Sequence, residues 1–372
     1  MTKELVKLEK IFKDKTVLIT GHTGFKGSWL SLWLTRLGSN VIGLADDIPT
    51  KPSNFDVNHI SNVVQDNRID IRNYRKVDQL IKDSSPDFVF HLAAQSLVRE
   101  SYENPLKTME VNAIGTANVL ESLVSLEKKV VAIMITSDKA YDNVEWVWGY
   151  KETDRLGGKD PYSASKGMAE LAIKAYFDSF IKEKSNNISL GIARAGNVIG
   201  GGDWAKDRIV PDCVKSWSMN EPVKIRNPNS TRPWQHVLEP LSGYIALAIN
   251  LIKNEQLSGQ AYNFGPPANQ NHTVDELLIE MRKSWENIEW NYDIEKGDIF
   301  HEASLLKLNC DKALVDLNWF PTLDFNQTVN MTVQWYKQYY DDTSKNMIDF
   351  SNQQIQAFME AAIDKNNLWI TS

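Results

Sequence analysis

The chain has 372 residues, of which 42% are hydrophobic and 24% charged, with a formal net charge of −7 and a pI near 5.5. This composition is ordinary for a globular protein, and the acidic balance argues against a broad basic surface for nucleic acid or anionic membrane. The length predicts two closely joined lobes. The two cysteines, Cys213 and Cys310, form no CxxC pattern, so neither a disulfide framework nor a zinc site is expected.

The N-terminal segment and the hydropathy of the chain predict its location. The first ten residues contain charges and no apolar segment, and nowhere do 18 apolar residues run together. We therefore expect no signal peptide, no membrane-spanning helix and a cytoplasmic protein.

A glycine-rich turn follows the first apolar run. Residues 16–20 are TVLIT, residues 21–27 are GHTGFKG, and Leu30, Trp33 and Leu34 then recur at helical spacing. A strand, a turn with glycine at every third position and a helix together form a dinucleotide site, in which the diphosphate lies on the helix N-terminus. The candidate cofactor residues in this turn are Gly21, Thr23, Gly24, Phe25, Lys26 and Gly27.

Acidic residues further along bear on the choice between NAD and NADP. Residues 41–44 (VIGL) predict a second strand, and Asp46 stands about 20 residues beyond the glycines, where a carboxylate binds the ribose hydroxyls and disfavours a 2′-phosphate. Ala45 occupies the position directly after the strand, so Asp46 could equally be a solvated loop residue. Asp70 and Ile71 follow another short apolar stretch and could face the adenine. NAD is the expected cofactor.

The segment 88–95 (FVFHLAAQ) predicts the next buried strand, and it ends in small residues. Leu92, Ala93 and Ala94 would let a flat cofactor approach closely. His91 is expected to be a core histidine, because no other His, Cys or carboxylate stands at metal-ligand spacing to it.

A central strand is predicted at residues 130–135 (VVAIMI), after a helix over about 106–126. The apolar run is typical of a strand covered on both faces. Residues 136–139 (TSDK) therefore lie at the carboxyl end of a central parallel strand, where open α/β sheets bind their ligands. Asp138 and Lys139 are candidates for chemistry here, and an ordinary loop ion pair is the alternative.

Tyr162 and Lys166 lie four residues apart, on one face of a predicted helix. The ammonium can favour the ionised phenol, which makes Tyr162 a candidate proton acceptor. The pattern alone is weak, because Tyr292 and Lys296 repeat it, in our interpretation by accident. A solvated pair on a helix surface is the alternative that the surrounding motifs argue against.

Together these motifs resemble the extended short-chain dehydrogenase/reductase superfamily, the group that contains the nucleotide-sugar enzymes. The residues concerned are Gly21, Gly24, Gly27, Leu92, Ala93, Ala94, Ser137, Tyr162 and Lys166. Four segments resemble, more narrowly, the CDP-glucose 4,6-dehydratase family: GHTGFKGSW at 21–29, TSDK at 136–139, GNVIGGGDW at 196–204 and RPWQH at 232–236.

The resemblance implies the fold and its division. We expect an α/β protein with a Rossmann-type doubly wound parallel sheet and a smaller mixed α/β substrate-binding lobe. Residues 10–200 would bind NAD and contain the catalytic residues, and residues 201–340 would form the second lobe, with some segments returning to the first. The tail at 341–372 matches nothing that we recognise.

The reaction follows from the residues and the resemblance together. Oxidation of a sugar hydroxyl needs a base, and Tyr162 can serve with Lys166 beside it and Ser137 on the same oxygen. A plain dehydrogenase needs no more, so Asp138 and Lys139 indicate elimination of water. The family implies that Asp138 is the acid and Lys139 the base or its proton-relay partner. Lys139 could instead pair with Asp138 and position it, since a lysine acts as a base only if its pKa is lowered.

The resemblance implies CDP-D-glucose as substrate and CDP-4-dehydro-6-deoxy-D-glucose as product, for deoxysugar synthesis toward surface polysaccharide such as the lipopolysaccharide O antigen. The expected substrate ligands are Gln95, Ser137, Asn197, Arg208 and Arg232. A guanidinium matches phosphate oxygens, although either arginine alone could form a surface salt bridge. Trp204 and Trp234 are expected in the core or between the lobes.

Two alternatives stay open. The first is a 4,6-dehydratase or 4-epimerase that acts on a dTDP-, UDP- or GDP-linked sugar. The second is a dinucleotide-binding protein without catalysis, against which the intact Ser137, Tyr162 and Lys166 argue. The superfamily also implies a homodimer or homotetramer, formed through the helices near 106–126 and 162–180.

Overall fold

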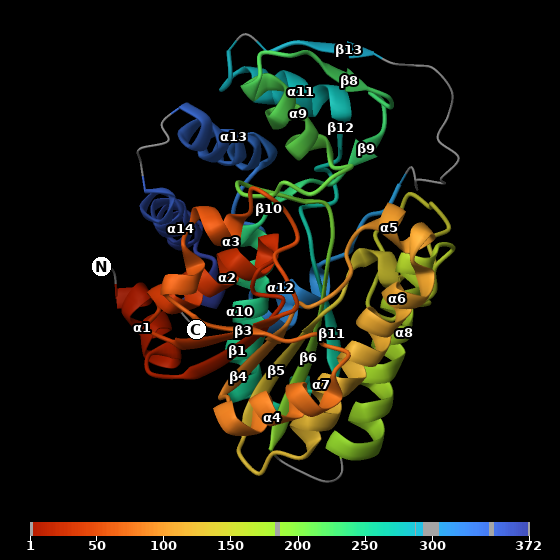
Figure 1. The fold of residues 1–372 in the computed structure, drawn as a ribbon, viewed down its shortest axis with the longest axis vertical. Helices are drawn as coiled ribbons and strands as arrows, with labels where there is room; N and C mark the ends of the chain where they lie inside the picture. The colour runs from red at the N-terminus through yellow and green to blue at the C-terminus, as the bar shows by residue number, and fades with distance from the viewer. Residues whose placement is uncertain (1–2, 183–186, 287, 293–304, 342–345, 371–372) are drawn as a thin grey trace.

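The computed structural model describes residues 3–182, 187–286, 288–292, 305–341 and 346–370. Its centre is a seven-stranded sheet in the order β11-β6-β5-β4-β1-β2-β3, in which every neighbouring pair is parallel (Figure 1). These strands are β1 (Thr16–Thr20), β2 (Asn40–Ala45), β3 (Gln65–Arg68), β4 (Phe88–His91), β5 (Val130–Ile135), β6 (Ile188–Ala195) and β11 (Gln260–Phe264). The expected Rossmann-type sheet is confirmed.

The helices vary from one turn to five turns. They are α1 (Lys3–Phe12), α2 (Phe25–Arg36), α3 (Asn54–Val57), α4 (Tyr74–Ser84), α5 (Val98–Glu103), α6 (Pro105–Met109), α7 (Gly115–Val124), α8 (Pro161–Tyr176), α9 (Ile209–Ser218), α10 (Leu238–Lys253), α11 (Val274–Arg282), α12 (Asp311–Leu317), α13 (Phe325–Asp341) and α14 (Met347–Asp364). The helix expected over 106–126 is divided, because a π-helical segment at Glu110–Ile114 separates α6 from α7. Among the described residues, no helix is long and apolar enough to cross a membrane.

Apolar side chains point alternately to the two faces of the sheet along its strands, so both faces need helices to cover them. Val17 and Ile19 of β1 belong to one hydrophobic cluster, whereas Leu18 between them belongs to a second. Successive side chains of a strand point to opposite faces. The first cluster includes Trp33 of α2, and the second includes Leu120 of α7. The sheet is therefore buried on both sides, as its near-continuous apolar runs predict.

A smaller mixed α/β lobe lies beyond one end of the sheet, around α9 and α11 (Figure 1). Its short strands pair as β8 (Val223–Ile225) with β13 (Trp290–Tyr292), and as β9 (Thr231–Arg232) with β12 (His272–Thr273). A further pair, β7 (Val198–Ile199) with β10 (Gln235–His236), links this lobe to the end of β6. Since β11 comes after residue 200 and joins the large sheet, the two lobes are not continuous in sequence.

The tail after residue 341 packs on the helix that follows the glycine turn. The ring of Trp33 in α2 lies 5.7 Å from that of Phe358 in α14 and 6.1 Å from that of Trp369. Trp335 of α13 donates its indole N–H to Ser351 of α14 at 2.8 Å. The tail thus completes the core on the side of the sheet that α2 covers.

Candidate active site

The glycine turn between β1 and α2 fits a bound diphosphate. Gly21 has a φ of +77°, and a Cβ there would lie 2.8 Å from the backbone nitrogen of Ala93. A Cβ on Gly27 would lie 2.0 Å from the carbonyl oxygen of Gly21, so neither position admits a side chain without movement. Gly24 is the N-cap of α2 and makes no side-chain cap hydrogen bond. The first N–H groups of α2 therefore have no capping side chain in competition with an anion.

The carboxyl ends of β1 and β2 lie side by side, and the turn is tied to the second of them. Thr23 donates its hydroxyl to the carbonyl oxygen of Asp47 at 2.6 Å. Asp46 is exposed and directly follows Ala45, the last residue of β2. Asp46 is thus free to face a ribose beside the turn, and its role stays a prediction.

Asp70 and Ile71 follow β3 at the same edge of the sheet. Arg72 binds the carboxylate of Asp70 at 2.6 Å, and this hydrogen bond holds the pKa of Asp70 below its usual value. Ile71 is buried in the cluster beneath α7. Contact of either residue with an adenine stays a prediction.

His91, the last residue of β4, is a satisfied core histidine, as expected. Its Nδ1 lies 2.7 Å from the hydroxyl of Thr20, and its Nε2 lies 2.9 Å from that of Thr116. Burial lowers the pKa of His91 to about 3, so the ring is neutral. The N–H of Ala93 donates to the Thr20 hydroxyl at 3.1 Å, which places residues 92–94 beside the glycine turn.

Gln95 is engaged in the loop that follows. Its Nε2 donates to the carbonyl oxygen of Leu97 at 3.0 Å and to the hydroxyl of Thr108 at 2.9 Å. Its backbone N–H donates to Asn112 at 2.8 Å. Binding of substrate by Gln95 stays a prediction, and it requires the side chain to exchange these partners.

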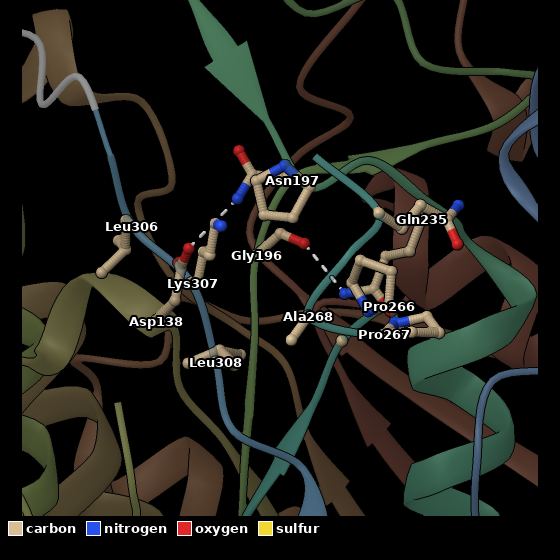
Figure 2. Close-up of a pocket in the computed structure, with 13 residues that line it drawn as sticks. Asp138, Gly196, Asn197, Gln235, Pro266, Pro267, Ala268, Leu306, Lys307 and Leu308 are labelled. Atoms are coloured by element: carbon tan, nitrogen blue, oxygen red, sulfur yellow. Dashed lines mark hydrogen bonds between the residues drawn. The ribbon is translucent and has the colours of Figure 1, made fainter. Parts of the chain in front are cut away.

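Ser137 and Asp138 form a hydrogen-bonded pair one residue beyond the end of β5 (Val130–Ile135). Ser137 caps a short 3₁₀ turn, Asp138–Ala140, and its Oγ accepts from the N–H of Lys139 at 3.2 Å and donates to Oδ1 of Asp138 at 2.8 Å. The side chain of Asp138 is buried. Asn197 lies over it, with its Nδ2 3.4 Å from Oδ2 (Figure 2).

Gly196, the first residue of the family-like segment at 196–204, is a site residue that was not among the expected catalytic or ligand residues. A Cβ on Gly196 would lie 2.0 Å from Oδ2 of Asp138. The backbone between β6 and β7 therefore touches the carboxylate, and any larger residue would displace it. A glycine directly before a candidate ligand, here Asn197, is the signal that could have indicated this contact.

Tyr162 and Lys166 stand in the first turns of α8. Asp160 caps the helix by accepting the N–H of Ser163 at 2.9 Å, and Pro161 occupies the first turn. Burial raises the pKa of Tyr162 to about 12, and a hydrogen bond with Ser137 opposes that rise. Burial lowers the pKa of Lys166 to about 8. Burial outweighs the neighbouring charges on Tyr162, so ionisation of the phenol needs further positive charge from the reaction partners.

Two further cationic side chains, those of Lys26 and Arg208, lie near Tyr162 and Asp138. Burial lowers the pKa of Lys26 to about 8, and among its neighbouring charges Asp138 raises that pKa whereas Arg208 and Lys166 lower it. Arg208 precedes α9, and its Nη1 donates to Asp203 at 2.7 Å. Lys26 of the glycine turn thus interacts electrostatically with Asp138. The position of Lys26 in the sequence does not indicate this interaction.

A narrow cavity lies between the carboxylate of Asp138 and the second lobe. It has room of about 10 Å³ for a water-sized solute. Its walls are Asp138, Gly196, Asn197, Pro233, Gln235, Gly265, Pro266, Pro267, Ala268, Gln270, Leu306, Lys307 and Leu308 (Figure 2). No three His, Cys, Asp or Glu residues in the described ranges are placed to hold a metal ion.

Arg232 and the two candidate tryptophans lie in or near the second lobe. Arg232 is half-buried in β9 and donates Nη1 to the carbonyl oxygen of Thr231 at 2.9 Å. Trp204 and Trp234 are buried, in agreement with the expected core positions. Of the accidental pair, Tyr292 is exposed, and Lys296 lies outside the described residues.

Comparison with known proteins identifies the family. The family described as GDP-mannose 4,6 dehydratase matches residues 18–332. The chain belongs to this family. It is also 44% identical over 357 residues to the CDP-glucose 4,6-dehydratase of Salmonella typhimurium, across 95% of this chain and 98% of that protein. The CDP-paratose 2-epimerase of Salmonella typhi is 24% identical, across 86% of this chain and 98% of the relative.

Solved structures of known proteins have the same fold as this chain. The epimerase Mth375 of Methanothermobacter thermautotrophicus has a TM-score of 0.76 at 23% identity, over 91% of this chain and 97% of its own. The dTDP-glucose 4,6-dehydratase of Bacillus anthracis, solved in complex with NAD, has a TM-score of 0.69 at 21% identity, over 87% and 97%. These structures confirm the predicted fold, and the family model and the Salmonella typhimurium relative confirm the predicted family.

Proposed function

We propose that the protein is an NAD-dependent hydro-lyase that converts CDP-D-glucose to CDP-4-dehydro-6-deoxy-D-glucose. The observation that supports this most is the contact between Ser137 and Asp138, which adds an acid to the Tyr162 and Lys166 pair of an oxidoreductase. The near full-length similarity to a CDP-glucose 4,6-dehydratase supports the same reaction and the choice of nucleotide.

The glycine turn would hold the cofactor. The contact of Gly21 with Ala93 and the uncapped start of α2 suit a diphosphate, and Asp46 suits the free ribose hydroxyls of NAD. When bound, NAD supplies a hydride acceptor for carbon 4 of the sugar and a hydride donor for carbon 6.

Tyr162 would take the proton of the carbon-4 hydroxyl. Its phenol is buried and next to Ser137, which would hydrogen-bond the same oxygen. The charge of Arg208 favours the ionised phenol, and Lys166, four residues further along the same helix, would add to it when the reaction partners are bound. Once carbon 4 is a ketone, the proton on carbon 5 becomes acidic and can be removed.

Asp138 would protonate the departing carbon-6 hydroxyl, and Lys139 would accept the carbon-5 proton. Among the described residues Asp138 forms no ion pair with Lys139, and its oxygens face Ser137 and Asn197 instead. Lys139 is half-buried beside it. This arrangement favours Lys139 as a separate proton acceptor over a group that only positions Asp138.

Asn197, Arg208 and Arg232 would bind the diphosphate of the substrate. Asn197 and Arg208 follow β6 on the side of the second lobe, and Arg232 lies in that lobe. Only one nitrogen of Arg208 is used by Asp203, so its guanidinium retains N–H groups for phosphate oxygens.

The assembly and location belong to the same proposal. Apolar side chains are exposed on α6, on the π-helical segment after it and on α8, with Leu106 at 69%, Ile114 at 55% and Leu171 at 59%. Large apolar residues exposed together suit an interface, and we infer a homodimer or homotetramer formed through α6, α7 and α8. An oligomer in the cytoplasm is expected, and light scattering of the purified chain measures its mass.

The substrate is tested by incubating the purified chain and NAD separately with CDP-, dTDP-, UDP- and GDP-linked sugars. The proposal predicts a 4-keto-6-deoxy product from CDP-glucose at the highest kcat/KM. Turnover of another nucleotide sugar with unchanged CDP-glucose would favour the alternative enzyme.

A further inference from the structure

Residues 200–204 form a loop between β7 and α9 that is held between helices from both ends of the chain. Trp29 of α2 donates its indole N–H to the carbonyl oxygen of Gly201 at 2.8 Å. On the other side, a Cβ on Gly201 would lie 2.0 Å from Cγ of Trp335 in α13, so only glycine fits between the two helices. The path of this loop is therefore set by α2 and α13 together.

Tyr336 of α13 holds the next part of the loop by its hydroxyl group. The hydroxyl accepts the backbone N–H of Asp203 at 3.0 Å and donates to the carbonyl oxygen of the same residue at 2.5 Å. Both side chains are buried, with exposed fractions of 4% for Asp203 and 0% for Tyr336. One side chain near the end of the chain thus fixes the backbone on both sides of a buried carboxylate.

The carboxylate of Asp203 binds Arg208. Its Oδ1 accepts the backbone N–H of Ala205 at 3.0 Å, and its Oδ2 accepts Nη1 of Arg208 at 2.7 Å. Since each oxygen has a donor, rotation of the carboxylate would break a hydrogen bond. The side chain of Asp203 is 6% exposed, whereas that of Arg208 is 35% exposed. The guanidinium is therefore open to a ligand from which the carboxylate is shielded.

A fixed guanidinium suits an arginine that binds phosphate. A free arginine side chain has many rotamers, and their loss on binding opposes affinity. A partner that holds Arg208 beforehand removes part of that cost. Since a guanidinium has five N–H donors, the bond to Asp203 leaves others for phosphate oxygens.

We propose that Asp203, held by Tyr336, is a positioning residue that orients the guanidinium of Arg208 for the diphosphate of the substrate. The inference rests on the proposed function and deepens it. Helix α13 thereby contributes to diphosphate binding through a carboxylate that is itself shielded from the ligand.

The test compares the dissociation constants of CDP and cytidine for the full chain with NAD bound, because the ratio of the two isolates the contribution of the phosphates. Asp203→Asn keeps the shape of the side chain and an acceptor for Ala205, but it loses the charge that holds Arg208. We expect the variant to reduce the preference for CDP over cytidine by about 10-fold to 100-fold, the range for a lost hydrogen bond to a charged group. An unchanged preference would overturn the positioning role.

The affinity for NAD separates positioning from a structural loss. Because Trp29 of α2 binds the same loop, a collapse of residues 200–204 would disturb the helix that follows the glycine turn. Such a collapse would weaken NAD together with CDP. We expect Asp203→Asn to bind NAD as the wild type does. Equal losses of affinity for NAD and CDP would overturn the positioning role.

Two tyrosines of α13 provide a matched pair of variants. Tyr336→Phe releases the backbone of Asp203 and should also reduce the preference for CDP, and it serves as the test if Asp203→Asn does not fold. Tyr340→Phe removes a hydroxyl that accepts the indole N–H of Trp204 at 3.1 Å, and it should leave the preference unchanged. An equal reduction in the two variants would contradict a specific role of Asp203.

The outcome for the wild-type chain distinguishes this inference from the proposed function. Conversion of CDP-glucose by the wild type, with an unchanged preference for CDP in Asp203→Asn and Tyr336→Phe, would overturn the positioning role alone. A wild-type chain that neither binds CDP nor converts CDP-glucose would overturn the proposed function, and the positioning role with it.

Discussion

Glu170 of α8 and Arg194 of β6 form a buried, bidentate ion pair beneath the candidate site. Arg194 Nε lies 2.7 Å from Oε1 and Nη2 lies 2.6 Å from Oε2. Thr136, the residue before Ser137, donates its hydroxyl to the same Oε1 at 2.6 Å. One carboxylate therefore joins the end of β5 to the helix that holds Tyr162.

Replacement of Glu170 by Gln should destabilise the chain strongly. The change leaves the guanidinium of Arg194 buried without its charge partner, which costs about 3–5 kcal/mol. Asp178→Asn is the matched control, since it breaks an exposed pair with Lys174 at 2.9 Å, worth about 0–1 kcal/mol. Urea unfolding measures both variants. Equal losses in the two would show that the buried pair does not hold the elements together.

Gly196→Ala should impair the loss of water more than the binding of cofactor. The new Cβ would lie 2.0 Å from Oδ2 of Asp138 and must displace the carboxylate, and a misplacement of this kind costs about 100-fold in rate. Gly265→Ala, on the same cavity, is the control because its nearest atom is the sulfur of Cys310 at 3.6 Å. Single-turnover rates and NAD titrations measure the effect. Similar rates in both variants would contradict the close contact with Asp138.

Lys139→Met should still permit oxidation at carbon 4 but stop before loss of water. The variant removes the proposed acceptor of the carbon-5 proton and leaves Tyr162 and Lys166 intact. NADH absorbance should therefore rise and persist after CDP-glucose is added. If Lys139→Met turns over like wild type, Lys139 is not a proton-transfer group.

Activity should fall as the pH rises above about 8. Burial lowers the pKa of Lys166 to about 8, so the side chain is cationic below that pH and loses its charge above it. The cation favours the ionised phenol of Tyr162, and its loss should lower kcat/KM. Lys166→Arg keeps the charge and should move the alkaline decline upward. An identical alkaline limb in Lys166→Arg would mean that another group titrates there, and Lys26 has a pKa in the same range.

Local patterns identify the parts of the site that lie on single elements. The strand at 16–20 and the glycine turn are adjacent in sequence, so the pattern of apolar residues and glycines predicts both. Tyr162 and Lys166 lie four residues apart, and this spacing predicts that they share one helix face. The electrostatic interaction between Lys26 and Asp138 and the ion pair of Glu170 with Arg194 join segments far apart in the chain. Such contacts depend on the order of the strands, which residue spacing does not specify.

The position of the tail after residue 341 also could not be predicted from the sequence. Its helix α14 contains apolar residues at helical spacing, but only the structure places Phe358 on Trp33. Likewise, the segment 260–264 (QAYNF) is a short mixed stretch whose partner β6 lies about 70 residues earlier, so its place in the large sheet depends on the whole fold.

The proposed dehydration moves the carbon-4 hydrogen of the sugar to carbon 6 without releasing it from the site. Turnover of CDP-glucose with deuterium at carbon 4, in ordinary water, tests it most directly. We expect a 4-keto-6-deoxy product with deuterium in the carbon-6 methyl group. A product without deuterium at carbon 6, or a C4 epimer that retains it at carbon 4, would rule out this internal hydride transfer.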